Sequence, residues 1–366
     1  MRRMSPKPPQ IVDRLPAEPT VGDSLAKPFD LHLSRRGALK GLLGFAGAAL
    51  VAPALSRMAS ARSSAPKDKK IRDIDKGRLG TTITMELESA PFPHKNSSYK
   101  DSTVIVFVPN HFRVRSDYRI DVLIHFHGYR DTARDAMLRH QMREQFEASK
   151  QNAIVIFPQG PVNSDDMDGG KLDEAGGLLS LLTEVRLTLQ TSSLQASMGR
   201  AGIPNKARIG KCLLSAHSGG FRVLSYCLER GGYDVNEVFL FDALYGRTGT
   251  FRDWVAETYA RSGSMSERHK LISFYSGPAP SAENRRLMYF FDKQKIEYVS
   301  EEIEGTELSK RDITKARAVF IKTSSTHDRV LFRTNALRDC LYASCLSRFV
   351  KTDWFKDTSA PRISPR

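Results

Sequence analysis

Cysteine is scarce in this chain of 366 residues, and long apolar runs are missing. Four cysteines without a Cys-x-x-Cys pair are too few for a disulfide-dense scaffold. A single disulfide is one possibility, but buried free thiols are favoured for Cys212, Cys227, Cys340 and Cys345. The uncharged stretch 41–56 falls short of the roughly 20 apolar residues that a spanning helix needs, so no stable membrane span is expected.

Several binding motifs are also missing. The sequence has no P-loop, no dinucleotide fingerprint and no His-Glu-x-x-His pair, so it indicates no cofactor. Hydrophobic residues make up 40% and charged residues 27%, a balance that excludes a wholly disordered chain. The formal charge is +15, but basic residues are scattered and no readout motif accompanies them. The sequence therefore predicts no nucleic-acid partner.

The amino-terminal segment has the order of a secretory signal. The basic stretch Ser34-Arg35-Arg36-Gly37-Ala38-Leu39-Lys40 precedes the uncharged stretch, and Ala59-Ser60-Ala61 supplies a small-residue cleavage site. The paired arginines resemble the bacterial twin-arginine signal, although Ala38 stands where that signal prefers a large apolar residue. A single-pass anchor or a chance arginine pair is the alternative. The resemblance implies the twin-arginine export machinery as partner and a periplasmic or secreted location.

The remaining chain is predicted to form one domain. Residues 1–61 are assigned to the signal with an extended basic region, 62–76 to a polar linker, 77–356 to the domain and 357–366 to a tail. Short apolar runs alternate with amphipathic stretches, which indicates an α/β fold with a mostly parallel sheet and helices on both faces. The expected strands are 81–88, 103–108, 121–126, 153–157, 207–214, 238–241, 271–275 and 318–322, and the expected helices are 135–150, 177–189, 221–228, 251–259, 282–293 and 330–347.

One apolar run leads through Ala216-His217-Ser218-Gly219-Gly220 directly into a helical stretch. A nucleophile on such a sharp strand-to-helix turn needs very small neighbours two residues to either side, and Ala216 and Gly220 satisfy this need. Ser218 would then lie at a helix amino terminus, where backbone N–H groups face a developing oxyanion. The alternative is a glycine-rich turn with an N-cap serine.

Two further segments favour a catalytic role for Ser218. An apolar run ends in His125-Phe126-His127-Gly128-Tyr129, and a His-Gly loop at a strand end is a source of a second oxyanion donor. The backbone N–H groups of Tyr129 and Gly219 are the candidate pair. His327 follows the last predicted strand, which suits a general base that takes the serine proton.

The acid should lie between Ser218 and His327 in the chain. Asp242 directly follows the run 238–241, where its carboxylate could orient His327. A structural aspartate that binds loop N–H groups is the alternative. The next run ends in Ser276-Gly277-Pro278, and Glu283 is the carboxylate soon after it. Asp242 is favoured, and Glu283 stays open.

With these motifs in order, the sequence resembles the α/β-hydrolase superfamily. The resemblance covers most of the chain after the signal and implies an eight-stranded, mostly parallel sheet and a serine nucleophile that forms a covalent acyl-enzyme. Two departures stand out. Ala216 replaces the first glycine of the Gly-x-Ser-x-Gly pentapeptide, and Asp242 follows the strand before the one that most members use.

Two metal-like patterns are weaker. His125 and His127 are two apart on a strand, but the histidine-aspartate pattern of metallo-hydrolases would need Asp and His where Tyr129 and Arg130 stand. The loop 164–170 has the spacing of a calcium loop, yet Ala175 occupies the position that requires glutamate. No metal is therefore expected.

The sequence as a whole predicts an exported serine hydrolase that cleaves a carboxylic ester through Ser218, His327 and Asp242. Its substrate would be a small-molecule or envelope-derived ester. An amidase or peptidase with the same triad is the alternative enzyme, because the triad does not distinguish esters from amides. A non-catalytic envelope binding protein on the same fold is the alternative outside enzymes.

Overall fold

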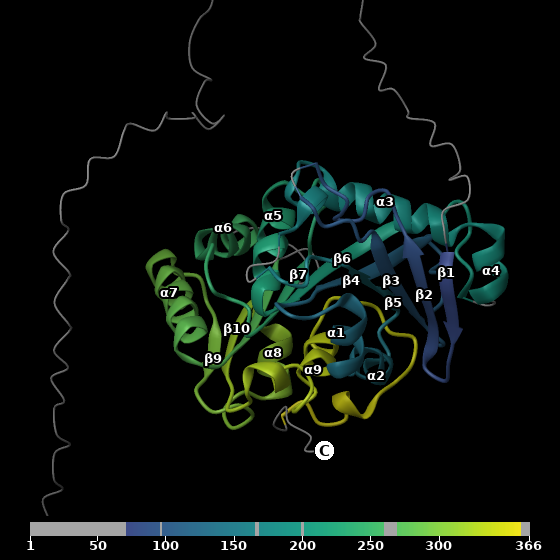
Figure 1. Ribbon diagram of the computed structural model, residues 1–366. Coiled ribbons are helices and arrows are strands. Elements are labelled where there is room, and N and C mark those ends of the chain that lie inside the picture. Colours follow the sequence, from purple (N-terminus) through teal and green to yellow (C-terminus); the bar gives the residue numbers. More distant parts are fainter. Residues whose placement is uncertain (1–70, 96, 165–167, 199–200, 260–268, 360–366) are drawn as a thin grey trace, which may run out of the picture. The chain divides into compact units, whose positions relative to one another are not determined.

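The computed structural model describes residues 71–359 except 96, 165–167, 199–200 and 260–268 (Figure 1). The chain divides into two units, Met1–Ser60 and Ala61–Arg366. The predicted signal and the first part of the predicted linker lie outside the described residues. Among these described residues, no helix is long and apolar enough to cross a membrane. All four cysteines are free thiols, and Cys345 is the one among them that is not fully buried.

One sheet of ten strands organises the described chain, in the order β1-β2-β3-β5-β4-β6-β7-β8-β10-β9 (Figure 1). Strands β1 to β3 pair antiparallel with their neighbours, and β5 through β9 in that order pair parallel. The strands are β1 Ile71–Lys76, β2 Gly80–Glu86, β3 Thr103–Pro109, β4 Arg119–Phe126, β5 Ala153–Pro158, β6 Arg208–His217, β7 Glu237–Phe241, β8 Lys270–Tyr275, β9 Val299–Glu301 and β10 Ala318–Lys322.

The predicted α/β class with a mostly parallel sheet is confirmed, and the predicted count of eight strands is wrong. The two additional strands, β1 and β9, form the two edges of the sheet. Strand β1 falls within the predicted linker 62–76, which is therefore not a linker over its last six residues. Four of its six residues are charged and exposed, and Ile71 and Ile74 are the two apolar ones. Charge on an edge strand discourages edge-to-edge pairing. Strand β9 has three residues, too few to leave a pattern.

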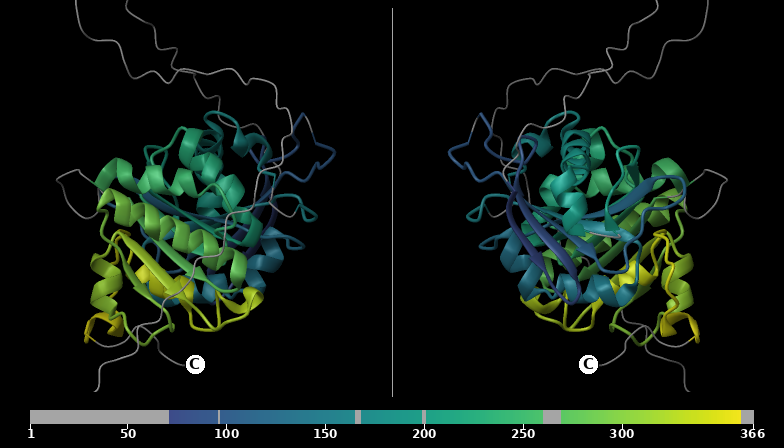
Figure 2. Two further views of the ribbon diagram at one scale, coloured as in Figure 1. Left: turned by 90° about the vertical axis from the view of Figure 1, so that its left-hand side faces the viewer. Right: turned by 90° about the vertical axis from the view of Figure 1, so that its right-hand side faces the viewer.

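Helices cover both faces of the sheet, as predicted (Figures 1 and 2). The teal and green helices α3, α5, α6 and α7 lie on one face, and α1, α2, α8 and α9 lie on the other. The helices are α1 Ala133–Arg139, α2 Met142–Ser149, α3 Gly177–Leu189, α4 Ser192–Met198, α5 Phe221–Arg230, α6 Thr248–Tyr259, α7 Pro278–Gln294, α8 Lys310–Lys315 and α9 Ala336–Tyr342.

Two long predicted helices are interrupted. The prediction of one helix over 135–150 is wrong, because Gln141 adopts a left-handed backbone with φ 50° between α1 and α2. The prediction of one helix over 330–347 is also wrong, because Asn335 has φ 56° and α9 begins only after it. A left-handed residue cannot continue a right-handed helix, so each stretch turns there.

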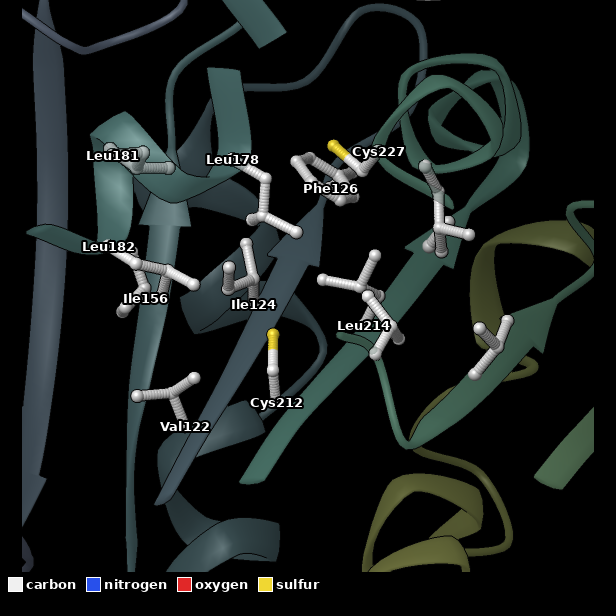
Figure 3. Packing of buried hydrophobic residues seen from close by; sticks show 14 of the residues in the cluster. Val122, Ile124, Phe126, Ile156, Leu178, Leu181, Leu182, Cys212, Leu214 and Cys227 are labelled. Carbon is white, nitrogen blue, oxygen red and sulfur yellow. The ribbon is translucent and has the colours of Figure 1, made fainter. Parts of the chain in front are cut away.

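The core consists of two apolar layers, one on each face of the sheet. Successive residues of a buried strand point to opposite faces, so Leu213 and Leu214 enter different layers. Figure 3 shows Leu178, Leu181 and Leu182 of α3 packed over Ile124 and Ile156. Burial at about 25 cal/mol per Å2 of apolar surface anchors the central strands. The strand ends that carry the candidate site are therefore held on rigid elements.

Candidate active site

Strand β6 runs directly into a three-residue 3-10 turn, Ser218–Gly220, and then into α5. Ser218 is half-buried and has φ 53°, a left-handed conformation that costs a non-glycine residue about 1–3 kcal/mol. The turn also needs a residue without a side chain at Gly220. A Cβ atom there would lie 2.6 Å from the carbonyl oxygen of Phe126. The predicted strained turn with a serine at its apex is present.

The His-Gly loop after β4 meets this turn. A Cβ atom on Gly128 would lie 2.6 Å from the Cβ and 3.3 Å from the Oγ of Ser218, so only glycine allows this approach. His127 holds the loop: its Nδ1–H donates to the carbonyl of Gly128 at 2.9 Å, and its Nε2 accepts from the N–H of Gly160 at 3.0 Å. Tyr129, whose N–H was predicted as an oxyanion donor, directly follows Gly128 in the chain.

The sheet register brings Asp242 to the level of the turn. His217 pairs with Phe241 on the adjacent parallel strand, so Ser218 and Asp242 follow β6 and β7 at the same carboxyl-terminal ends of the strands. Asp242 is buried and also left-handed, with φ 47°. Carboxyl ends of parallel strands share one edge, which is where α/β sheets collect functional residues.

Asp242 contacts His327 directly. The Nδ1–H of His327 donates to Asp242 Oδ2 at 2.7 Å. Ser276 satisfies the rest of the carboxylate, because its N–H donates to Oδ1 at 2.7 Å and its Oγ–H donates to Oδ2 at 2.8 Å. A buried carboxylate needs such partners to offset its desolvation. With Nδ1 protonated, the second nitrogen of His327 is left to accept a proton.

Glu283, the other candidate acid, lies elsewhere. Its carboxylate accepts from the Thr248 hydroxyl and pairs with the Arg286 guanidinium at 3.2 Å. Among the side chains that the structure describes, neither Glu283 nor the Ser218 hydroxyl makes a hydrogen bond to His327. A missing hydrogen bond between the serine and the histidine is common in structures without substrate, since catalytic hydrogen bonds often form or tighten only in the complex.

Two neighbours of His327 were not singled out by the sequence. Tyr245 lies with its hydroxyl 3.4 Å from His327 Nδ1, and burial together with Asp242 raises the pKa of Tyr245 to about 12. His217 donates from Nε2 to the main-chain carbonyl of His327 at 2.9 Å. The signal for His217 was its place directly before Ser218. Ser276 was visible as the residue that ends the strand next to β7.

The two histidines considered as metal ligands have other partners. His125 is fully buried with Nδ1 2.9 Å from the Ser215 hydroxyl, and both nitrogens of His127 are engaged in its loop. Within the described ranges no group of three or more histidine, cysteine or acidic side chains could hold a metal ion. Three residues of the loop 164–170, which has calcium-loop spacing, lie outside the described residues.

A cavity of about 600 Å3 lies away from these residues. Val299, Ala316 and Arg317 contribute to its lining and stand at the starts of β9 and β10. It therefore lies toward the amino-terminal ends of these parallel strands, whereas Ser218 lies at the carboxyl-terminal end of β6. No acid-base pair was predicted there.

Comparisons with known proteins find similarity in structure only. No protein-family model and no curated protein sequence matches the chain. The chain is similar to a mutant of the feruloyl esterase module from Clostridium thermocellum complexed with sinapinate, with a TM-score of 0.43 and 11% identity over 79% of this chain and 98% of that chain. It is similar to a fluorophosphonate-binding serine hydrolase of Staphylococcus aureus, with a TM-score of 0.38 and 10% identity over 72% of this chain and 97% of that chain.

A third similar structure is a peroxisomal alpha-beta-hydrolase of Saccharomyces cerevisiae. Its TM-score is 0.39 at 10% identity, over 73% of this chain and 88% of that chain. Identities and TM-scores are low in all three comparisons. Any function assigned to this chain therefore has to follow from the geometry of its own site.

Proposed function

We propose that this protein is a serine hydrolase that cleaves a carboxylic ester through an acyl-enzyme on Ser218. The observation that carries the proposal is the 2.7 Å hydrogen bond between His327 and buried Asp242, at the strand level of the strained Ser218 turn. Strain of this kind persists where the surrounding structure enforces it, and it clusters at active sites. If His327 were only a surface residue, or Asp242 only a structural one, no hydrogen bond between the two would be needed.

In the proposed reaction, the Ser218 hydroxyl attacks the acyl carbonyl while His327 takes its proton. Asp242 holds the imidazole and stabilises the imidazolium. The N–H groups of Gly219 and Tyr129 donate to the oxyanion, and each such donor is typically worth about 10²–10³ in rate. The imidazolium then gives its proton to the departing alcohol. Water, deprotonated by His327, attacks the acyl-enzyme. The bond from the acyl carbon to Ser218 Oγ then breaks, the imidazolium returns its proton to that oxygen, and the acid is released.

We also propose that the protein is exported by the twin-arginine route. The support is the order of Arg35 and Arg36, the uncharged stretch 41–56 and the Ala59-Ser60-Ala61 site. Such a signal directs the export of folded proteins. That suits a site whose residues follow β4, β6, β7 and β10, which are far apart in the sequence and come together only on folding. Small-molecule or envelope-derived esters are then the substrate class to test.

The test is labelling of the purified chain with a fluorophosphonate, followed by mass spectrometry of the adduct. We expect one adduct on Ser218, and none in Ser218→Ala or His327→Gln. Ser225→Ala is the matched control, because Ser225 is a buried serine on α5 whose hydroxyl donates to the Arg222 carbonyl at 2.6 Å. Its labelling should equal that of the wild type.

Turnover of matched ester and anilide substrates follows the labelling. Hydrolysis of the ester alone supports the carboxylic ester hydrolase, whereas hydrolysis of the anilide shifts the assignment to an amidase. A folded chain with an unmodified Ser218 would overturn the proposal and favour a binding protein.

A further inference from the structure

His217 joins the two segments that must meet for the proposed reaction. It is the last residue of β6, so its main chain continues directly into Ser218. Its side chain donates from Nε2 to the main-chain carbonyl of His327 at 2.9 Å. Because a carbonyl oxygen only accepts, this bond requires the tautomer with the proton on Nε2. The bond therefore links the turn of the nucleophile to the loop of the base.

His327 is held at both its side chain and its main chain. His327 begins a 3-10 turn of three residues, His327–Arg329, that has no side-chain cap. Asp242 at 2.7 Å and the Tyr245 hydroxyl at 3.4 Å both contact the side chain at Nδ1. The bond from His217 holds the main chain of the same residue. Two anchors on different parts of His327 determine where its free nitrogen points.

The rings of the two histidines also lie against each other. Their centroids are 4.6 Å apart with an interplanar angle of 33°, and 38% of the His327 side chain is exposed against a buried His217. The ring of His140 also contacts His217, with centroids 4.9 Å apart, and His140 is fully buried. The ring of His217 therefore contacts both a fully buried histidine and the base. Burial and the neighbouring His327 lower the pKa of His217 to about 4, so it stays neutral when His327 takes up a proton.

We propose that His217 is a positioning residue, which through its bond to the His327 carbonyl and its ring contact holds the base over Ser218. The inference rests on the proposed function, since it assigns a role within the same site. His217 itself exchanges no proton with substrate in this role. Its loss should slow the chemical step and leave substrate binding almost unchanged.

The experiment compares His217→Phe and His217→Gln with the wild type by fluorophosphonate labelling rate and by ester turnover. Phenylalanine keeps the ring contact and loses the donor, and a misplaced catalytic group can cost about 100-fold in rate. We expect that loss in kcat for His217→Phe, with KM within about threefold of the wild type. The glutamine amide supplies a donor at the position of Nε2, so His217→Gln should recover most of the rate.

The matched control is His111→Phe. His111 makes the same type of bond, 2.9 Å from its Nε2 to the Gln151 carbonyl, just before β5 and so at the opposite edge of the sheet. Thermal melting of all three variants reports folding. His111→Phe should lower stability without changing the labelling rate, which separates a general loss of packing from a positioning effect.

The wild type offers a test that needs no variant to fold. Nitrogen-15 NMR of the imidazoles should show His217 as the neutral Nε2–H tautomer from pH 8 down to about pH 5. An Nδ1–H tautomer, or a His217→Phe variant that labels as fast as the wild type, would overturn the positioning role. A wild type that is folded and unlabelled at Ser218 would instead overturn the proposed function, so the two failures are distinguishable.

Discussion

At the scale of single residues, four buried histidines lie on or next to the strands that carry the candidate site. Burial lowers the pKa of His125, His127, His140 and His217, and that of His140 falls to about 3. His140 is the extreme case, because it is fully buried and neither ring nitrogen has a hydrogen-bond partner among the described residues. A buried polar atom without a partner costs about 1–3 kcal/mol, so an apolar ring of similar shape should be tolerated there.

We predict that His140→Phe reduces the acid sensitivity of the fold. In the wild type the pKa of His140 is lower in the folded than in the unfolded state, so unfolding takes up a proton below pH 6.5. The free energy of unfolding is therefore unaffected by this titration above pH 6.5, and it falls by about 1.4 kcal/mol per pH unit as the pH drops from there toward 3. Urea unfolding of both proteins between pH 7 and pH 4 measures the two slopes. Equal slopes would show that His140 does not control this loss.

At the scale of elements, two turns are packed so closely that side chains are excluded from them. We predict that Gly128→Ala reduces ester turnover by about 100-fold, since the added Cβ would displace the Ser218 side chain from the position needed for attack. Gly249→Ala is the control, because the nearest atom to an added Cβ there is 3.9 Å away on the flexible Arg252 side chain. Turnover and melting temperature are measured for both. Normal turnover in Gly128→Ala would contradict the prediction, because it would mean that the His-Gly loop moves to admit the added Cβ and leaves Ser218 in place.

The ends of two helices depend on one buried lysine. Lys270, at the start of β8, donates from Nζ to the carbonyls of Ile313 at 2.6 Å and Thr314 at 3.1 Å in α8, and of Ala343 at 2.7 Å after α9. These carbonyls lie at helix carboxyl ends, where a cation is favoured by the helix dipole. Glu237 lies within the same buried region and raises the pKa of Lys270, against the larger lowering by burial.

We predict that Lys270→Met lowers the free energy of unfolding by about 3 kcal/mol, because it removes three hydrogen bonds and one of the two lysine charges, Lys270 and Lys211, that favour the ionised form of buried Glu237. Amide hydrogen exchange should show the loss first in α8 and α9. Lys315→Met, at an exposed position on α8, is the control and should stay within about 0.5 kcal/mol of the wild type. Uniform exchange across the sheet would contradict the assignment of Lys270 to the helix ends.

At the scale of the whole molecule, the proposed export signal can be tested separately from the proposed active site. We predict that replacing Arg35 and Arg36 together by lysine retains most of the protein in the bacterial cytoplasm, because twin-arginine signals depend on the arginine pair itself. Fractionation of cells that express the full chain measures the distribution. The pair Arg2 and Arg3, replaced in the same way, is the control with equal charge. Equal export of both variants would remove the twin-arginine proposal.

Much of the fold could be predicted because its signals are local. Runs such as 121–126 and 238–241 are apolar on both faces, so they predict central parallel strands flanked by helices. The turn at Ser218 was visible for the same reason, since its small neighbours are adjacent in the chain. The edge strands β1 and β9 were not, because β1 is mostly charged and reads as a linker, and β9 has three residues, too few to leave a pattern.

The sequence by itself determined the class of fold, the strained serine turn and the candidates Ser218, His327, Gly219 and Tyr129, because each depends on neighbours within a few residues. Only the tertiary structure decided between Asp242 and Glu283 as the partner of His327, since that choice depends on which strand ends meet. The same holds for the contacts of His217, Ser276 and Tyr245. Hydrogen bonds between residues far apart in the chain follow from sheet register, and no local pattern encodes it.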